Sequence, residues 1–515
     1  MWIALGVVVA LVAGLIAYDL IQRRHAILRN FPIIGHFRYL LEMVGPELRQ
    51  YIVTGNDDER PFSRDRRRWI YASAKRQDNR FGFGSDNDMD GVPDYLIIRH
   101  VAFPAPPPAD GAPGSAPGHA VPGGKVWGAA RGRRHAFRPP SIVNVSGMSF
   151  GALSGRAIEG MNRGCAIAGA LHTTGEGGIA PAHLHGGELI FQVGTGYFGC
   201  RDQAGRFDLD RLAETVAAHP VRAIEFKLSQ GAKPGRGGML PAAKVTPEIA
   251  AARGVPAGVD CVSPPYHSAF SDVDTMLEVL EAVAERTGLP VGIKSAVGED
   301  GFWWDLATRM AATGRGVDFV TVDGGEGGTG AAPLVFADHV AFPFKMAMAR
   351  VYTAFATHGL AEDVAFAGAG KLGFPEKALF AFGLGCDTVN VGREAMMAVG
   401  CIQAQRCHTG RCPTGVATQK KRLTRGLDPG TKGERMADYL VVLRREILQL
   451  SRACGAPHPA LVPAGRLELL DGRFGARTVA EAFEYAPGWA EPSPGRAAAI
   501  AALMAGEPAP AAAPA

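Results

Sequence analysis

The chain has 515 residues and a formal net charge of +4 at pH 7. A charge this weak argues against nucleic-acid binding, which needs a strongly basic face. Glycine accounts for 67 residues, nearly twice its usual share of roughly 7%, but no G-X-Y period accompanies it, so the sequence is not collagen-like. In a chain that is 47% hydrophobic, this excess indicates tight turns at which backbone approaches a ligand closely.

An uncharged apolar run opens the chain. It spans residues 2–18 and is followed by Asp19 and then by Arg23 and Arg24. A secretory signal would carry its positive charge before the apolar run, whereas here the charge follows. We therefore predict that residues 1–20 form a single-pass anchor in the cytoplasmic membrane, with the catalytic domain facing the cytoplasm by the positive-inside rule. The alternative is a buried or interfacial helix.

The segments on either side of the central part are expected to be accessory. Residues 21–102 are interpreted as an N-terminal cytoplasmic region, and the Pro/Gly-rich residues 103–135 as a flexible linker or loop that buries too little apolar surface to order itself. Beyond the central part we expect a C-terminal helical region over 426–490. The Ala/Pro-rich residues 491–515 are expected to be a disordered tail.

Short β-branched runs alternate with segments of helical length across residues 136–425. Their continuous apolar character suits parallel strands buried on both faces, and the intervening segments are long enough for crossover helices. Eight such units predict an α/β fold, the (β/α)₈ TIM barrel. The alternative, a doubly wound open sheet, expects its Gly-rich turn after the first strand, whereas glycines follow almost every run here. The runs are 141–146, 171–174, 223–228, 260–264, 290–295, 319–325, 364–370 and 388–393.

The loops after the predicted strands should build the active site, because barrel enzymes carry it at the C-terminal ends of their strands. The last two loops are where barrels commonly bind a phosphate through backbone N–H groups. Gly368, Gly370, Gly392 and Arg393 lie in these loops and are interpreted as a phosphate cradle.

Three cysteines follow the eighth run with the spacing C-x₅-C-x₄-C, at Cys401, Cys407 and Cys412. Closely spaced thiolates in a reducing compartment favour a metal site over disulfides. The C-x₂-C spacing usual for zinc is absent. Three ligands instead fit an iron–sulfur cluster that lacks one iron. The alternative is three ordinary buried cysteines.

Several of these loops together carry a family resemblance. The segments MSFGALS (148–154), TTGEGG (173–178), QGAKPGRGG (230–238), DGGEGGTGAAP (323–333) and C-x₅-C-x₄-C-P-x-GVATQ occur in this order. They closely resemble the FMN-binding synthase domain of glutamate synthase large subunits over about residues 140–425. The resemblance implies an FMN-containing barrel and a [3Fe–4S] cluster on the three cysteines that passes electrons to the flavin. It also implies reduction of 2-iminoglutarate, made from 2-oxoglutarate and ammonia, to glutamate.

The resemblance also assigns residues. It implies that Glu176, Lys227, Lys233 and Arg253 line the substrate pocket. Lys233 and Arg253 are candidates to bind substrate carboxylates, and Lys227 is a candidate proton donor or polariser, or alternatively part of a strand-end salt bridge. The cation of Lys294 would stabilise a reduced flavin. The implied flavin contacts are Ser146, Gly147, Met148, Ser149, Gln230, Lys294, Asp323, Gly324, Gly325, Gly368, Gly370, Gly392 and Arg393.

Two departures from the family pattern affect function. Met239 stands where the family has Gln, and a thioether cannot donate a hydrogen bond, so another small 2-oxo acid or amine is an alternative substrate. No glutaminase segment and no G-x-G-x-x-G strand-turn-helix unit are found in the sequence. We therefore expect the protein to use ammonia and to take electrons from a separate ferredoxin-like donor or NAD(P)H-flavoprotein subunit. A non-catalytic, membrane-tethered electron-transfer subunit is the alternative from a different class.

Overall fold

The computed structural model describes residues 2–22, 25–89 and 91–507, and the chain forms one unit up to Trp69 and a second from Ile70 onward. In the first unit, α1 (Trp2–Ile21) is apolar enough to cross a membrane, with a mean hydropathy of 2.4. Asp19 near its end accepts a hydrogen bond from Ile33 N (3.0 Å). The other helices of this unit are α2 (Ala26–Asn30), α3 (Ile34–Leu48) and the π-helical turn Arg49–Val53, and α4 (Arg64–Ala74) leads into the second unit.

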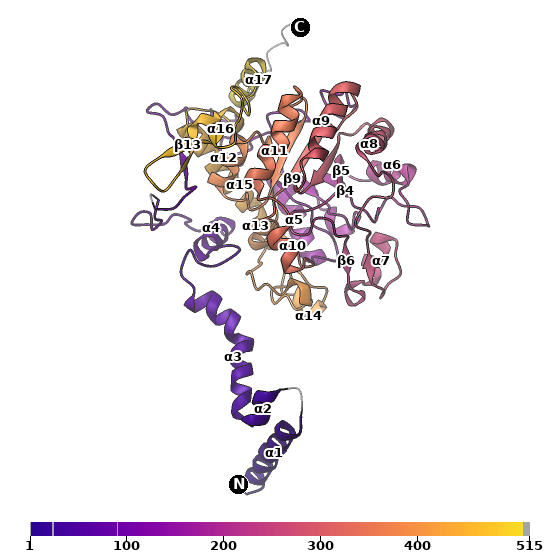
Figure 1. Cartoon of the computed structure of the whole chain (residues 1–515), viewed down its shortest axis with the longest axis vertical. Coiled ribbons are helices and arrows are strands. Elements are labelled where there is room, and N and C mark those ends of the chain that lie inside the picture. Colours follow the sequence, from indigo (N-terminus) through magenta and orange to yellow (C-terminus); the bar gives the residue numbers. More distant parts are fainter. Residues whose placement is uncertain (1, 23–24, 90, 508–515) are drawn as a thin grey trace. The chain divides into compact units, whose positions relative to one another are not determined.

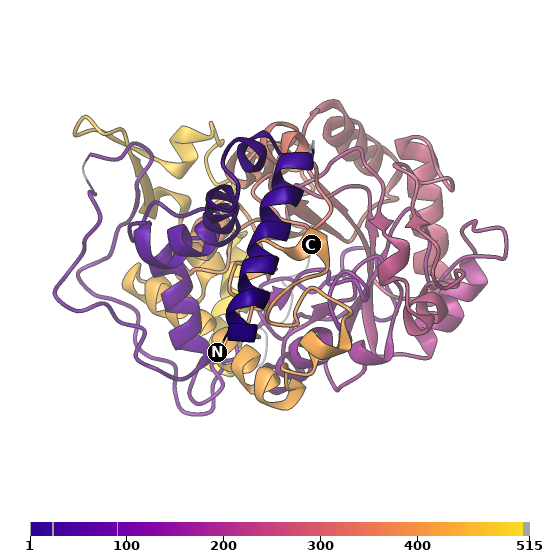
Figure 2. The same cartoon turned by 90° about the horizontal axis from the view of Figure 1, so that it is seen from below.

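A closed barrel of eight parallel strands forms the centre of the second unit, with helices around it (Figures 1 and 2). The barrel closes where the eighth strand pairs with the first, with Val389 opposite Val143. The predicted TIM barrel is therefore confirmed. Its strands are β2 (Val143–Val145), β3 (His172–Thr173), β4 (Leu189–Val193), β5 (Val221–Lys227), β8 (Val291–Ser295), β9 (Phe319–Asp323), β10 (Ala365–Ala369) and β11 (Thr388–Val391).

One predicted strand was wrong. Residues 260–264 do not enter the barrel: β7 (Cys261–Val262) pairs antiparallel with β6 (Met239–Leu240) in a separate two-stranded ribbon. Val262 is 66% exposed, and two prolines follow it, whereas every residue of β4 is buried. A central barrel strand must be apolar on both faces and free of proline, so the missed run LIFQV of β4 takes the place in the barrel.

Crossover helices cover the barrel. α5 (Gly155–Ala168) packs closely on α15 (Pro429–Ala453), and a Cβ at Gly164 would lie 2.4 Å from Cβ of Met436, so glycine permits the approach. The remaining helices are α6 (Leu209–Ala217), α7 (Pro247–Arg253), α8 (Val273–Thr287), α9 (Gly301–Thr313), α10 (Leu334–His339), α11 (Phe344–Thr357), α12 (Pro375–Gly383), α13 (Arg393–Ala398), α14 (Lys421–Thr424), α16 (Val479–Ala482) and α17 (Pro494–Ala505).

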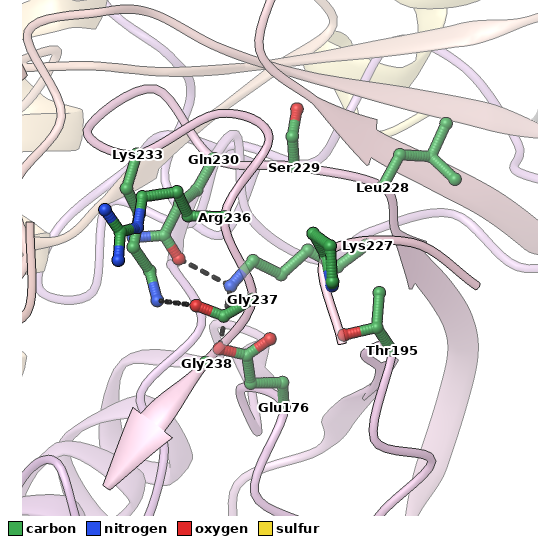
Figure 3. A pocket seen from close by; sticks show the side chains of 11 residues that line it. Glu176, Thr195, Lys227, Leu228, Ser229, Gln230, Lys233, Arg236, Gly237 and Gly238 are labelled. Carbon is green, nitrogen blue, oxygen red and sulfur yellow. Dashed lines mark hydrogen bonds and ion pairs between the residues drawn. The ribbon is translucent and has the colours of Figure 1, made fainter. Parts of the chain in front are cut away.

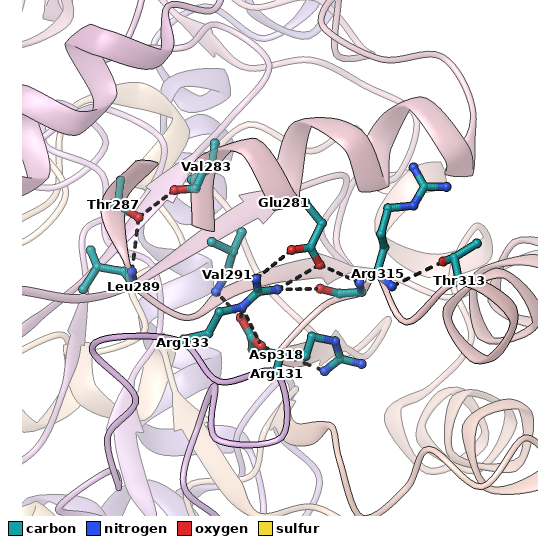
Figure 4. A network of polar contacts seen from close by, with 11 residues as sticks. Arg131, Arg133, Glu281, Val283, Thr287, Leu289, Val291, Thr313, Arg315 and Asp318 are labelled. Carbon is teal, nitrogen blue, oxygen red and sulfur yellow. Dashed lines mark hydrogen bonds and ion pairs between the residues drawn. The ribbon is translucent and has the colours of Figure 1, made fainter. Parts of the chain in front are cut away.

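The expected flexible linker over 103–135 is instead packed against the N-terminal end of the barrel. Trp127 is buried and stacks on Phe319 of β9, with ring centroids 4.4 Å apart. Nearby, Arg133 binds the carboxylates of Asp318 (3.0 Å) and Glu281 (2.6 Å), as Figure 4 shows. The buried ring of Trp127 and the ion pairs of Arg133 hold this Pro/Gly-rich segment in place, so it covers the N-terminal end of the barrel.

The C-terminal expectations also need correction. Residues 426–490 are not wholly helical, because β12 (Leu467–Leu470) pairs with β13 (Ala476–Thr478) and with β1 (Leu96–Ile98) in an antiparallel sheet. The tail expected over 491–515 contains α17, which buries Ile500 and Met504. Its alanines favour a helix and its apolar residues give it a face to bury. Residues 508–515 lie outside the described part.

Candidate active site

A pocket opens among the loops that follow β3, β4 and β5, at the C-terminal ends of the barrel strands (Figure 3). Most of its polar side chains come from the stretch that begins at Lys227, the last residue of β5, and continues through the glycine-rich loop to β6. The lining residues are Glu176, Thr195, Lys227, Leu228, Ser229, Gln230, Lys233, Arg236, Gly237, Gly238 and Pro265.

Lys227 and Glu176 form an ion pair in the pocket. Nζ of Lys227 lies 3.0 Å from Oε1 of Glu176 and donates to Oε1 of Gln230 at 2.5 Å. Burial alone would raise the pKa of Glu176, but Lys227, Lys233 and Arg253 hold it below its usual value. Glu176 is therefore a carboxylate at neutral pH, and its ion pair fixes the position of the Lys227 side chain.

Lys233 lies on the same loop and is also buried. Its Nζ donates to the carbonyl oxygen of Gly237 at 3.0 Å. Burial lowers its pKa, Glu176 opposes that shift, and Lys227 and Arg236 add to it. Because the carboxylate of Glu176 compensates the charge of Lys233 only in part, this ammonium can bind an anion.

Arg253 does not line the pocket. It ends α7, where Nη2 donates to the carbonyl oxygen of Phe150 (3.1 Å) and the guanidinium lies over the ring of Phe198, 5.0 Å from its centroid. Met239 does not line the pocket either, because it begins β6 and is 56% exposed. Of the four predicted substrate residues, the structure thus brings together Glu176, Lys227 and Lys233, with Arg253 in the adjoining wall.

A second buried ion pair lies between β8 and β9. Nζ of Lys294 is 3.6 Å from Oδ2 of Asp323 and 3.5 Å from Oγ of Ser146. Burial would lower the pKa of Lys294, but the carboxylates of Asp323 and Glu225 together raise it above that of an ordinary lysine. Lys294 at the end of β8, Asp323 at the end of β9 and Ser146 in the loop after β2, all three predicted cofactor residues, therefore meet around one permanent cation.

Sequence reasoning missed a polar layer inside the barrel. Nε2 of Gln192 donates to Oε1 of Glu225 (2.6 Å), and Oγ1 of Thr321 donates to Oε2 of the same carboxylate (2.5 Å). These side chains are buried, on β4, β5 and β9. The available signal was a polar residue in the middle of each apolar run, in IFQV, AIEFK and FVTV, because a buried polar group needs a partner.

The loop after β2 carries four predicted cofactor residues at the barrel mouth. The backbone N of Ser146 donates to Val391 O (2.9 Å), and the carbonyl oxygen of Met148 accepts from Nε2 of buried His183 (3.1 Å). A Cβ at Gly147 would lie 3.0 Å from Oε1 of Gln192, so a larger residue would crowd the polar layer. Ser149 follows in the same loop, with its backbone N close to Gly175.

The glycines after β9 and β10 form a crowded backbone surface. Gly324 N donates to Ala369 O (2.8 Å), and a Cβ there would lie 2.7 Å from Cα of Phe344. Gly370 has a φ of +131°, which strongly favours glycine. At Gly325 and Gly368 a Cβ would also meet atoms within 3.0 Å, whereas at Gly392 it would find space. Most of the predicted phosphate cradle therefore requires glycine.

Arg393 begins α13 and is predominantly buried, and its guanidinium donates to the carbonyl oxygen of Glu326 in the loop after β9. Burial lowers its pKa, while the carboxylates of Glu394, Asp323 and Glu326 oppose the shift. Arg393 thus links the loops after β9 and β11 and places a cation beside the glycines of the cradle.

The three predicted metal ligands lie within electrostatic range of one another. Burial, together with the neighbouring Cys407 and Cys412, raises the pKa of Cys401 to about 12. At Cys412 burial would raise the pKa, but backbone N–H groups, including that of Ala417, hold it below its usual value. In the described ranges, no group of three or more His, Cys, Asp or Glu side chains is arranged to hold a metal ion, so the iron–sulfur cluster stays a prediction.

Comparison with known proteins identifies relatives of the chain. Residues 134–457 match the family described as the conserved region in glutamate synthase. The chain is 35% identical to the glutamate synthase large subunit-like protein of Bacillus subtilis, over 88% of this chain and 92% of that protein. It is also 35% identical to the archaeal glutamate synthase [NADPH] of Methanocaldococcus jannaschii, over 61% of this chain but only 59% of that protein. A solved structure of a mutant flavocytochrome b2 with pyruvate bound matches with a TM-score of 0.44 and 15% identity, over 89% of this chain and 90% of that chain.

Proposed function

The chain belongs to the glutamate synthase family of oxidoreductases, and we propose that it reduces 2-iminoglutarate, formed from 2-oxoglutarate and ammonia, to glutamate. The observation that carries this proposal is a pocket with Lys227, Lys233 and Glu176 at the mouth of a barrel whose interior holds Lys294. A dicarboxylate needs cations, and a reduced flavin needs a positive charge beside it.

The residues present fit FMN. Lys294 would neutralise the reduced ring, with Asp323 and Ser146 fixing the position of its ammonium. Gly368, Gly370 and Gly392, at the ends of β10 and β11, have no side chain of their own that would keep a phosphate from the backbone there. Bound FMN would supply a hydride to the imino carbon, and a [3Fe–4S] cluster on Cys401, Cys407 and Cys412 would supply electrons. The donor to that cluster is proposed to be a separate ferredoxin-like protein or NAD(P)H-flavoprotein subunit.

Chain residues have distinct roles in this proposal. Lys233 binds a substrate carboxylate, because the hydrogen-bond partner of its ammonium within the described part of the chain is a neutral group, the backbone oxygen of Gly237. Lys227, held in place by its ion pair with Glu176, polarises the imino group or donates a proton to its product. Arg253 supports the wall that holds Glu176, since its guanidinium is bound to the carbonyl of Phe150.

We also propose that α1 anchors the protein in the cytoplasmic membrane with the barrel on the cytoplasmic side. The support is the length and hydropathy of α1, in which only 6% of the apolar window is buried. Membrane fractionation of cells that produce the full chain tests this. Recovery in the soluble fraction would contradict the anchor.

The catalytic proposal is tested with the purified holoprotein. After anaerobic reduction, 2-oxoglutarate plus ammonia should reoxidise the flavin and form glutamate, whereas 2-oxoglutarate alone should not. Lys227→Met should slow this reoxidation, and Lys421→Met, on the exposed surface, serves as the matched control. A flavin that stays reduced with both compounds present would refute the proposed reaction.

A further inference from the structure

Arg236 is a pocket residue to which no role has been assigned so far. It lies on the exposed part of the loop between β5 and β6 and lines the pocket. Its guanidinium lies over the ring of Phe336 in α10, 5.3 Å from the ring centroid. Within residues 2–22, 25–89 and 91–507, no hydrogen bond or ion pair of its side chain is found. A guanidinium that is held in place by stacking but lacks an anion can bind a ligand.

The charges of the pocket do not balance. Lys227, Lys233 and Arg236 provide three cations, and Glu176 is the one carboxylate among the lining residues, which all lie in the described part. Glu176 pairs with Lys227 at 3.0 Å, and Lys233 binds only a neutral backbone oxygen. Two cations on one loop are therefore left without a carboxylate, and Figure 3 shows their side chains next to each other.

Neighbouring cations repel each other, and an anion that binds both relieves this repulsion. A carboxylate suits the site because guanidinium can bind its two oxygens through parallel N–H groups, while the lysine adds a point charge. We propose that Arg236 and Lys233 together bind the carboxylate of a dicarboxylic substrate that is remote from its 2-oxo group, and that Phe336 positions the guanidinium. This inference rests on the proposed function in taking the pocket as the substrate site.

The experiment measures binding to the oxidised holoprotein by calorimetry. The probes are 2-oxoglutarate and 2-oxopentanoate, which has the same chain length but lacks the second carboxylate. Arg236→Gln should weaken 2-oxoglutarate binding about 10- to 100-fold, as expected for the loss of a charged hydrogen bond, and leave 2-oxopentanoate unchanged. Phe336→Leu, which removes the aromatic face, should weaken it about 2- to 5-fold. Arg206→Gln removes the same charge from an exposed residue outside the pocket and should change neither.

Two results would overturn the inference. One is a wild-type protein that binds 2-oxoglutarate no more tightly than 2-oxopentanoate. The other is an Arg236→Gln variant that affects both compounds equally or neither. Turnover is measured separately, so a protein that never reoxidises with 2-oxoglutarate and ammonia would refute the proposed reaction, while a selective loss of dicarboxylate binding would still support Arg236.

Discussion

Replacing Lys294 by methionine tests whether this residue neutralises the barrel mouth. Lys294 and Asp323 are 8% and 11% exposed, with 3.6 Å between Nζ and Oδ2, and Glu225 also acts on the lysine. Methionine fills similar volume but leaves two buried carboxylates without their cation. Removing one partner of a buried pair costs about 3–5 kcal/mol. For a domain of this size that corresponds to a fall in Tm of roughly 3 to 5 °C.

The loss should depend on pH in a defined direction. Although burial opposes the shift, the carboxylates of Asp323 and Glu225 raise the pKa of Lys294 in the folded protein. The stability that its charge contributes is therefore fully present below the usual lysine pKa of about 10.4 and is lost as the pH rises through the raised folded value. The difference in Tm between wild type and Lys294→Met should be constant near pH 7 and shrink above about pH 10. Asp323→Asn combined with Lys294→Met should recover part of the lost stability at pH 7, because the pair is then removed as a whole.

Thermal unfolding of the full chain in detergent, followed by circular dichroism, provides the measurement. Phe474→Ala, at a fully exposed position, is the control for substitution itself. A Tm for Lys294→Met within about 1 °C of wild type at pH 7, or a deficit that does not shrink as the pH rises above about 10, would show that the buried carboxylates are not what this lysine neutralises.

Three further predictions concern other parts of the molecule. The Cys401→Ser variant should lose most of its iron, which is expected at about three atoms per chain for this cluster type. The control Cys454→Ser changes a buried cysteine elsewhere and should retain the iron. Purified wild-type protein without iron would contradict the cluster. Because burial lowers the pKa of Lys233, this side chain should lose its charge, and the protein its affinity for 2-oxoglutarate, at a lower pH than an ordinary lysine would. In Lys233→Arg the loss of affinity should occur at a higher pH. Identical pH profiles of affinity for wild type and variant, measured by calorimetry, would disprove this prediction. Trp127→Ala should cost about 3–5 kcal/mol in thermal unfolding, and a change below about 1 kcal/mol would show that Trp127 does not seal the barrel.

The sequence predicted the barrel because a parallel strand must be apolar on both faces, and seven of the eight runs expected to be strands are barrel strands. The error at β7 arose because two or three apolar residues followed by a turn look alike in a barrel strand and in a surface ribbon. Only the strand pairing distinguishes them: β7 pairs with β6, which follows the loop after β5. The packing of residues 103–135 could not be predicted either, because composition does not show that Trp127 contacts Phe319, which is distant in the sequence.

Site residues at strand ends were predictable because barrel geometry directs them toward a common mouth. Lys227 ends β5 and Asp323 ends β9, and both take part in ion pairs there. Arg253 ends a helix instead, so its direction depends on what α7 packs against, and its guanidinium is taken by Phe150 and Phe198. Arg236 carried no sequence signal that set it apart from other basic residues. What distinguishes it is a missing anionic partner, and a missing partner becomes visible only when every neighbouring charge has been located. In a pocket that already contains an ion pair, the cations that lack a carboxylate partner are therefore the candidates for ligand binding. The spacing of basic residues in the sequence does not identify them.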